Sequence, residues 1–442
     1  MAANERLELA RWACAQAKKH GAQEARASVS RTLNSSLEYR ERKVETLEES
    51  TVMGLNLSLY ADGKYSAHRT SDLRREAIET FVKEAVSMTR YLTEDENRRL
   101  PEPDYYEGRQ DFDLQMKDPG QAKVDPEDRH GLVRNIEAAA LNKGGDKVIS
   151  VTAGYSESVT ERALVSTNGF EGFDERTNFW CGAEVTAKDN GDKRPEDWWW
   201  EGRRHRGDLS KAKSIGEKAV ERALSRVGAD KVPTEKMPII FENRSAGRLV
   251  RFFGSGLRGR NLQQKRSFLE GKLGEKIAAE NLSIIDDPFI KRAQASRLYD
   301  GEGISAQRMP MIENGVLRNY YIDTYYGRKL GMRATTGQSS NIVFESDNKK
   351  SVKNWMKELN RGILVTGTLG GNSNSSTGDF STGVQGFLFE NGKVVRPVSA
   401  MNISGNHLEF WTKLLGIGDD AYEFSSSRTP SLVFDSMVIA GA

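Results

Sequence analysis

The chain has 442 residues, of which 37% are hydrophobic and 29% are charged, a composition typical of a soluble globular protein. This length predicts two or three domains, because a single hydrophobic core seldom serves so many residues. The 65 basic and 63 acidic residues leave a net charge of +2, which gives no overall attraction to nucleic acid or to anionic lipid.

The N-terminal segment predicts a helix rather than an export signal. Charged residues such as Glu5 and Arg11 interrupt its apolar positions, and apolar residues at three-to-four spacing predict a helix over residues 5–19. No run of about 18 uninterrupted apolar residues occurs, so no membrane span is expected. The two cysteines, Cys14 and Cys181, are too few for a disulfide framework or a thiolate metal site. We therefore expect a cytoplasmic protein.

After this helix the pattern changes to alternating polar and apolar residues, as in half-buried strands. Three such runs are ARASVSR (25–31), SSLEYRERKVETLEES (35–50) and VMGLNLSLYADGKYSAHRT (52–70). Asp62 and Gly63 predict a hairpin turn inside the last run. Asp72 is expected to cap a second helix with an apolar stripe.

Residues 98–121 are rich in proline, glycine and acidic residues and have no period, which predicts a linker. A helix is expected over residues 126–142. Strands are expected at VISVTAGYSES (148–158), ERALVSTNGFEG (161–172) and TNFWCGAEVTAKDNGD (177–192). A helix capped by Asp208 should then run to about Arg226.

The C-terminal half predicts mostly short strands and turns. Two segments, MIENGVLRN (311–319) and LFENGKVVR (388–396), place Glu-Asn-Gly between apolar strands, as in a type I′ hairpin. They are either an internal duplication or two uses of the best hairpin turn.

The predicted fold class is α+β. We expect an N-terminal α/β domain over residues 1–97, with an antiparallel or mixed sheet flanked by helices, followed by a linker over residues 98–125. A middle α+β segment, residues 126–230, should pack with the N-terminal domain. A strand-rich C-terminal domain should occupy residues 231–442.

The catalytic inventory excludes several enzyme classes. The five histidines are His20, His68, His130, His205 and His407. They lie far apart in sequence and none is followed by glutamate, so the helical HExxH zinc motif is absent. Neither G-x-S-x-G nor a P-loop occurs. A triad of His407, Ser404 and Asp379 can be drawn, but nothing in the spacing favours it over chance.

Two further clusters each allow a functional and a structural interpretation. Trp198, Trp199 and Trp200 precede three arginines and a histidine, which could stack on and neutralise nucleic acid. We favour tryptophans at a domain seam, with the arginines paired to Glu196, Asp197 and Glu201. Asp300 and Glu302 in SRLYDGEG could bind a cation, but carboxylates in such a turn are more often solvated.

The segment GNSNSSTGDFSTGVQGFLFENGKVVRPV (371–398) resembles the C-terminal signature of the PmbA (TldE) branch of the TldD/PmbA family. The resemblance extends through IIFENRSAGRLVRFFGSGLRGR, SFLEGKLGEKI, IIDDP, YDGEG and NISGN, and through YRERKVETLEESTVMGLNLSLYADGKYSAHRTSDL in the N-terminal part. It covers essentially the whole chain. Members are described as zinc-dependent proteases or as proposed modulators of DNA gyrase.

The resemblance implies that this chain lacks the family's metal site. TldD-type members carry an HExxxH helix and a later cysteine, and that helix corresponds here to GRLVRFFGSGLRG. Val250, Arg251 and Ser255 then stand in place of the first histidine, the glutamate and the second histidine. Residues 425–434 contain no cysteine. Valine cannot coordinate zinc and arginine would repel it, so no metal or other cofactor is expected here, and zinc only in a TldD-type partner.

The glycine-rich loop at residues 370–386 has two open interpretations. Its amide and hydroxyl side chains could contact an extended peptide along a substrate cleft, or they could satisfy the loop's own backbone. The residues concerned are Asn372, Asn374, Thr377, Asp379 and Phe380. No catalytic residue is expected in this chain.

The function that the resemblance implies is that of a non-catalytic subunit of a TldD/TldE-type metalloprotease that degrades or processes unfolded peptides. Its partner would be an HExxxH-bearing TldD-like subunit, or a second copy of the chain. One alternative is a non-enzymatic protein that binds DNA gyrase or nucleic acid, although the near-neutral charge argues against nucleic acid. Another is a homodimer with an unrecognised hydrolytic role.

Overall fold

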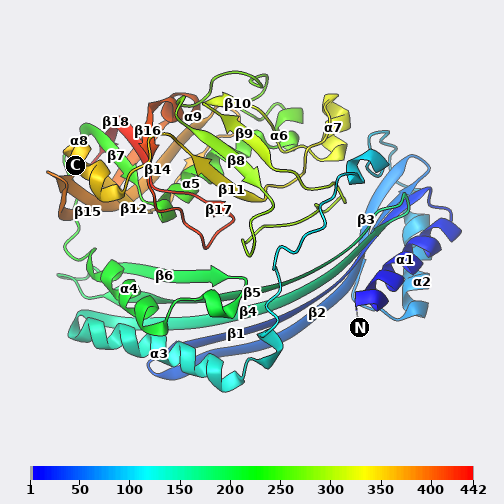
Figure 1. Ribbon diagram of the computed structural model, residues 1–442, viewed down its shortest axis with the longest axis horizontal. Coiled ribbons are helices and arrows are strands. Elements are labelled where there is room, and N and C mark those ends of the chain that lie inside the picture. The colour runs from blue at the N-terminus through cyan, green and yellow to red at the C-terminus, as the bar shows by residue number, and fades with distance from the viewer. Residues whose placement is uncertain (1–2, 442) are drawn as a thin grey trace.

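A computed structural model describes residues 3–441. One part is a long, curved sheet with four helices, and the other is a compact, strand-rich C-terminal domain that lies over it (Figure 1). Both helices and strands are abundant, and the two are not arranged as alternating parallel units. The predicted α+β class is therefore confirmed.

The long sheet contains six antiparallel strands in the order β3-β2-β1-β4-β5-β6. β4 lies directly against β1, so residues before and after the linker share this sheet. The strands are β1 (Glu24–Arg40), β2 (Lys43–Ala61), β3 (Lys64–Thr70), β4 (Val148–Ser166), β5 (Glu171–Ala187) and β6 (Glu196–Arg203).

Two details of the predicted strands are wrong. The second predicted run, residues 35–50, contains the β1–β2 turn at Glu41 and Arg42, both of which have positive φ. The segments predicted as separate strands at 148–158 and 161–172 form one strand, β4, because β1 and β5 pair with it along nearly its full length. The turn predicted at Asp62 and Gly63 is confirmed.

All four helices of this part cover one face of the sheet, in two pairs at its two ends (Figure 1). The helices are α1 (Ala3–Lys19), α2 (Arg75–Thr89), α3 (Pro126–Gly144) and α4 (Ala212–Leu224). α1 and α2 pack on alternate residues of β1 and β2, such as Val29 and Leu57. α3 and α4 pack on residues such as Tyr155 and Phe179. The opposite face meets the C-terminal domain, for example where Leu164 packs with Tyr299.

The predicted helix caps are wrong. α2 begins at Arg75, and Asp72 instead accepts hydrogen bonds from the Arg74 side chain and backbone. α4 begins at Ala212 after a short 3-10 turn that contains Asp208, so Asp208 does not cap it. The turn with Arg74 competes for the carboxylate of Asp72 because it forms between near neighbours in the chain, whereas the carboxylate of Asp208 pairs with Arg292.

The predicted linker has only two 3-10 turns, Pro103–Tyr106 and Gln121–Lys123. It is anchored to the C-terminal domain by Arg328, whose guanidinium donates to the carbonyls of Asn97, Arg99 and Leu100 and contacts the carboxylate of Glu102. The first residues of the segment that joins the two halves of the long sheet are therefore fixed to the C-terminal domain.

In the C-terminal domain, five strands pair in a closed ring, β12-β7-β18-β15-β14, because β14 also pairs with β12. β13 and β16 add to this barrel at its margins. The strands are β7 (Glu235–Phe241), β12 (Arg361–Thr368), β13 (Asn372–Ser373), β14 (Asp379–Glu390), β15 (Lys393–Asn406), β16 (Leu414–Ile417) and β18 (Leu432–Ala440).

A second sheet of the C-terminal domain has the order β10-β9-β8-β11-β17. Its strands are β8 (Ser283–Asp287), β9 (Met309–Glu313), β10 (Val316–Leu317), β11 (Asn341–Glu345) and β17 (Ser427–Arg428), and the helices of the domain are α5 (Asn243–Gly254), α6 (Gly259–Gln263), α7 (Thr324–Leu330), α8 (Val352–Leu359) and α9 (His407–Phe410). Both predicted Glu-Asn-Gly hairpins are confirmed, since Asn314 and Asn391 have φ of 49° and 52° before glycines of positive φ.

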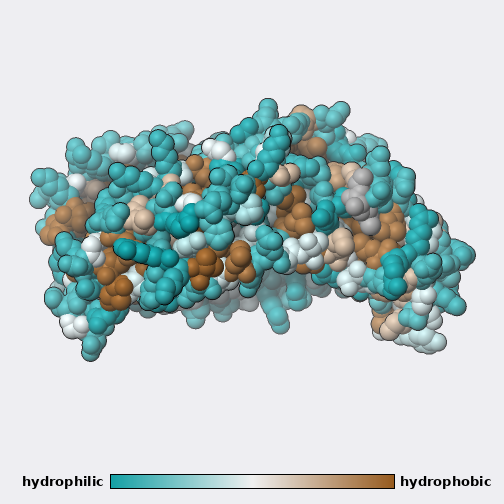
Figure 2. Space-filling model, turned by 90° about the horizontal axis from the view of Figure 1, so that it is seen from below, coloured by the Kyte–Doolittle hydropathy of each residue, from teal (hydrophilic) through white to brown (hydrophobic). Residues whose placement is uncertain are grey.

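The surface matches the composition. Seen from below, it is largely hydrophilic with separate hydrophobic patches (Figure 2). None of the helices within residues 3–441 has the length and apolar character needed to cross a lipid bilayer.

A buried charge cluster joins the two parts of the molecule. Asp197 of β6 is 5% exposed, accepts hydrogen bonds from Arg226, which follows α4, and from Arg244 of α5, and forms an ion pair with Arg222 of α4 at 3.3 Å. Arg222 also binds both carboxylate oxygens of Glu242, at 2.7 and 2.8 Å. We call these five residues the Asp197 cluster.

Candidate functional site

α5 follows β7 of the barrel directly and contains the segment that the resemblance aligns with the metal-binding helix of TldD-type proteins. Its buried face, including Leu249 and Phe253, packs into the main core of the C-terminal domain. Val250 packs at the edge of this core, and Arg251 is exposed. Ser255 donates its hydroxyl to the carbonyl oxygen of Phe252 at 2.7 Å.

These three side chains do not fit a metal ion. Val250 has no donor atom, Arg251 carries a positive charge, and the hydroxyl of Ser255 is already used within the helix end. Within residues 3–441, no group of three histidine, cysteine, aspartate or glutamate side chains is arranged to hold a metal ion.

The glycine-rich loop, residues 370–386, lies beside α5 and includes β13 and the first part of β14. Arg248 of α5 donates to the carbonyl oxygen of Gly371 at 3.0 Å, which ties the helix to the loop. Asn374 closes a tight turn, since its backbone N–H donates to Asp379 O and its carbonyl oxygen accepts from Gly378 N, both at 2.8 Å. The helix and the loop therefore form one structural unit.

The polar side chains of this turn mostly contact one another. Thr377 donates to one carboxylate oxygen of Asp379 at 2.6 Å, and Asn406 donates to the other at 2.9 Å. These two hydrogen bonds lower the pKa of Asp379, and the one from Thr377 has the larger effect. Asn372 and Asn374 are exposed. Contact of the turn with a peptide stays a prediction.

Phe380 is the one predicted loop residue that is buried, and it stacks on His407 with ring centres 4.8 Å apart. Phe268 stacks on the other face of the imidazole at 5.3 Å, and Phe253 of α5 meets its edge. Trp411 Nε1 donates to His407 Nδ1 at 3.3 Å, which leaves the proton on Nε2, 3.2 Å from the Ser373 hydroxyl. His407 is thus a packing centre between α5 and the loop.

The hydrolytic triad is not formed. The imidazole of His407 contacts Ser373 and Trp411, whereas Asp379 contacts Thr377 and Asn406. Ser404 lies exposed on β15. His407 is the first residue of α9, after β15 has ended, and its side chain is buried.

We expect His407 to make the fold sensitive to acid. Burial lowers the pKa of His407 from 6.5 to about 4. Above pH 6.5 the imidazole is neutral in both the folded and the unfolded chain, and its contribution is fully present. As the pH falls toward 4, only the unfolded chain takes up the proton, so stability is lost across this window.

Urea unfolding at about pH 7.5 and pH 4.5 measures this loss. Between these values, His407→Leu should lose roughly 2 kcal/mol less stability than the wild-type chain. Equal losses in the two proteins would show that His407 is not the group responsible.

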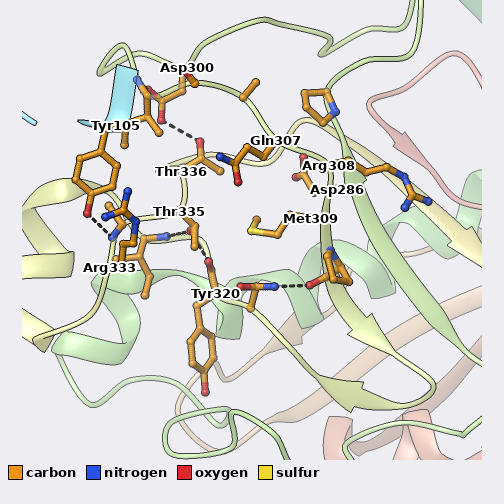
Figure 3. Close-up of a pocket in the computed structure, with 18 of the residues that line it drawn as sticks. Tyr105, Asp286, Asp300, Gln307, Arg308, Met309, Tyr320, Arg333, Thr335 and Thr336 are labelled. Atoms are coloured by element: carbon orange, nitrogen blue, oxygen red, sulfur yellow. Dashed lines mark hydrogen bonds between the residues drawn. The ribbon is translucent and has the colours of Figure 1, made fainter. Parts of the chain in front are cut away.

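A cavity of about 550 Å³ lies between the linker and the second sheet of the C-terminal domain (Figure 3). Buried Asp286 accepts from Ser340 N at 2.8 Å and Tyr321 Oη at 2.9 Å, and burial raises its pKa. Four arginines surround the cavity: Arg297, Arg308, Arg318 and Arg333. The hydrogen bonds of Arg297 go to neutral oxygen atoms, namely the carbonyls of Ser339 and Gln338 and the hydroxyl of Thr336.

A second cavity, of about 950 Å³, lies between the long sheet and the C-terminal domain and shares Arg297 and Asp300 with the first. Asp300 accepts from the backbone of its own turn, and Glu302 accepts from Thr324 N and Oγ1 at 2.9 and 2.8 Å. The expectation that these carboxylates are solvated is wrong, because the long sheet covers the turn and their hydrogen bonds are internal.

The tryptophans lie at a seam between the two parts, as predicted. The guanidinium of Arg244 stacks on Trp198 at 4.1 Å, and Trp199 packs against Phe424 of the C-terminal domain. The predicted ion pairs are wrong for the arginines that follow: Arg203 pairs with Glu423, and Arg204 donates to backbone carbonyls. Of the three acids, Asp197 is paired with arginines that are distant in sequence, whereas Glu196 accepts from Thr186 and Glu201 accepts from Trp199 Nε1 and Ser210 N.

Three family models match the chain in order. They are PmbA/TldA metallopeptidase domain 1 at residues 25–89, the central domain at residues 119–227 and the C-terminal domain at residues 234–441. Together they cover most of its length. The chain belongs to the PmbA/TldD family.

Individual PmbA/TldD relatives match over almost the whole chain. A crystal structure from Bacteroides thetaiotaomicron, named as a candidate modulator of DNA gyrase, is 39% identical, has a TM-score of 0.95 and covers 98% of both chains. Metalloprotease PmbA of Escherichia coli O157:H7 is 29% identical, covering 94% of this chain and 92% of the relative. TldE from Thermococcus kodakarensis, 22% identical with a TM-score of 0.84 over both full chains, shares the fold.

Sequence reasoning found the PmbA/TldD loop and helix but missed the two cavities and the Asp197 cluster. The YDGEG segment was the only local signal near a cavity, and its carboxylates were expected to be solvated. The cavity walls come from segments more than 150 residues apart, such as Arg26 and Arg297. A local sequence pattern cannot show that such distant segments line one cavity.

Proposed function

We propose that this chain is the metal-free subunit of a two-subunit peptidase that acts on unfolded peptides, with a TldD-type partner that carries the HExxxH helix. The proposal depends mainly on the residues of α5. The helix keeps its place against the glycine-rich loop, yet it has valine, arginine and serine where a metal-binding helix needs its ligands. A chain that has the family's helix and loop but no metal ligands is what we expect of a subunit that lines the active site while its partner binds the metal.

In this proposal the chain contributes one wall of the peptide-binding cleft. Among the strands of residues 3–441, β13 pairs only with β14, so its outer edge can accept an extended peptide as an added strand. An open groove beside it is lined by Gly371, Asn372, Ser381 and Asn402. The exposed amides of Asn372 and Asn374 would then bind peptide backbone, and the internally bonded Thr377 and Asp379 would hold the turn in shape.

The test combines the purified chain with an HExxxH-bearing TldD-type protein from the same genome, using an unstructured peptide as substrate. Cleavage is expected only when both proteins are present, and a metal chelator should abolish it. Replacing the glutamate of the partner's HExxxH motif should also abolish cleavage, whereas the isolated chain should bind no stoichiometric zinc. Chelator-sensitive cleavage by the isolated chain would overturn the proposal.

A further inference from the structure

β2 has a free edge along residues 43–53. β1 pairs with β2 over its whole length, but β3 pairs only with residues 55–61. No strand within residues 3–441 pairs with the other side of residues 43–53. At about 3.3 Å per residue this edge is roughly 36 Å long, and its outward backbone groups are available for a further strand.

The same segment exposes aliphatic side chains on both faces. Leu47 is 58% exposed and Met53 41%, on the face that bears the helices. Val44, 45% exposed, lies on this face too, because the β-bulge at Glu45 pairs it with Tyr39 of the helix-bearing face, whereas Val52, 46% exposed, lies on the opposite face. Long, straight edges with apolar residues favour aggregation unless another chain covers them. An added strand would cover the backbone and part of these four side chains.

The charges on this edge oppose pairing with a second copy. Residues 43–53 contain one lysine and three glutamates. Pairing them with themselves about a two-fold axis places Glu48 opposite Glu48. The neighbouring two-fold registers place Glu45 opposite Glu49, or Glu49 opposite Glu49. Like charges directly opposite each other destabilise a strand pair, so the edge suits a strand that carries positive charge.

We propose that residues 43–53 pair with an extended strand of the partner subunit, and that lysine or arginine side chains of this strand lie beside Glu45 and Glu48. The inference rests on the proposed two-subunit function and names its contact. Glu48 forms no ion pair within residues 3–441, and Glu45 only a loose one with Arg40 at 3.7 Å. Backbone hydrogen bonds supply affinity, and the glutamates exclude self-association.

Hydrogen exchange of the full chain, alone and with the TldD-type protein, tests the pairing directly. Outward-facing amides within residues 43–53 should exchange at least about tenfold more slowly in the complex, because strand pairing gives them acceptors. A stable complex without this protection would overturn the inference and leave the proposed function intact. Protection that develops with concentration in the chain alone, or that an unstructured peptide alone produces, would also overturn it.

Charge reversal supplies a second measurement. The double variant Glu45→Lys, Glu48→Lys should weaken binding of the TldD-type protein by about tenfold or more. The matched control is Glu76→Lys, Glu84→Lys, which makes the same change in charge at exposed positions of α2 and should bind as the wild type does. Equal losses in both variants would mean that net charge, rather than this edge, controls binding. A partner that never binds the wild-type chain would instead contradict the proposed function.

Discussion

Replacing Asp197 with alanine is expected to lower the free energy of unfolding by about 3–5 kcal/mol, because it leaves buried arginine side chains without a negatively charged partner. The Asp197 carboxylate lies 2.6 Å from Arg226 Nη2 and 2.7 Å from Arg244 Nη2. In the variant, the guanidinium groups of Arg226 and Arg244 lose the carboxylate of Asp197, and no other carboxylate among residues 3–441 is in ion-pair contact with them. Urea unfolding near neutral pH measures the loss.

The matched control for this prediction is Glu196→Ala, one residue earlier on the same strand. Glu196 is exposed and accepts one hydrogen bond, from Thr186, so its removal should change stability by no more than about 0.5 kcal/mol. Comparable losses in both variants would show that the buried cluster has no special role.

The same cluster predicts a direction of pH dependence. Burial opposes ionisation of Asp197, but Arg244, Arg222 and Arg226 together lower its pKa below the ordinary value of 3.8. Its contribution is therefore fully present above 3.8 and is lost as the pH falls through the lower, folded-state pKa. The acid sensitivity from His407 acts at higher pH, so the two effects can be separated.

The second large effect is expected from Gly386→Ala in the barrel. A Cβ atom at Gly386 would overlap the carbonyl oxygen of Leu364 on β12, where both neighbouring strand pairings shift register. Backbone cannot rotate away as a side chain can, so the barrel must open locally. We expect a loss of at least about 3 kcal/mol, at the upper end of the cost of overpacking.

Gly247→Ala provides the matched control. Gly247 lies inside α5 with nothing within 4 Å of the added methyl group. Alanine has a higher helix propensity than glycine, so this variant should be more stable by about 0.5–1 kcal/mol. Thermal unfolding of both variants checks the pair, and a tolerated Gly386→Ala would contradict the closed barrel.

Regular alternation made the long sheet predictable, and Asn-Gly turns fixed two hairpins in the C-terminal domain. The β1–β2 turn was missed because Glu41 and Arg42 adopt positive φ without glycine or asparagine. The two predicted segments of β4 left out Val159 and Thr160. There the strand continues because β1 and β5 pair with it on both sides.

The candidate site was predictable only where a continuous motif marked it. The glycine-rich loop and α5 were found in this way, and the structure brings them together through Arg248. His407 could not be placed from sequence, since its stacking partners Phe268 and Phe380 lie 139 and 27 residues away. The Asp197 cluster was missed for a related reason: nearby acids and arginines suggested local pairs, whereas burial selected distant ones.

The position of β4 beside β1 has a consequence for synthesis on the ribosome. Arg26 pairs with Ser166, so β1 emerges long before its second neighbour exists. Because synthesis proceeds at roughly 5–20 residues per second, the edge of β1 that later pairs with β4 stays unpaired for several seconds or more. Molecular chaperones that bind extended hydrophobic segments would act on this interval, and yield on overexpression should depend on them more than on the stability of the finished protein.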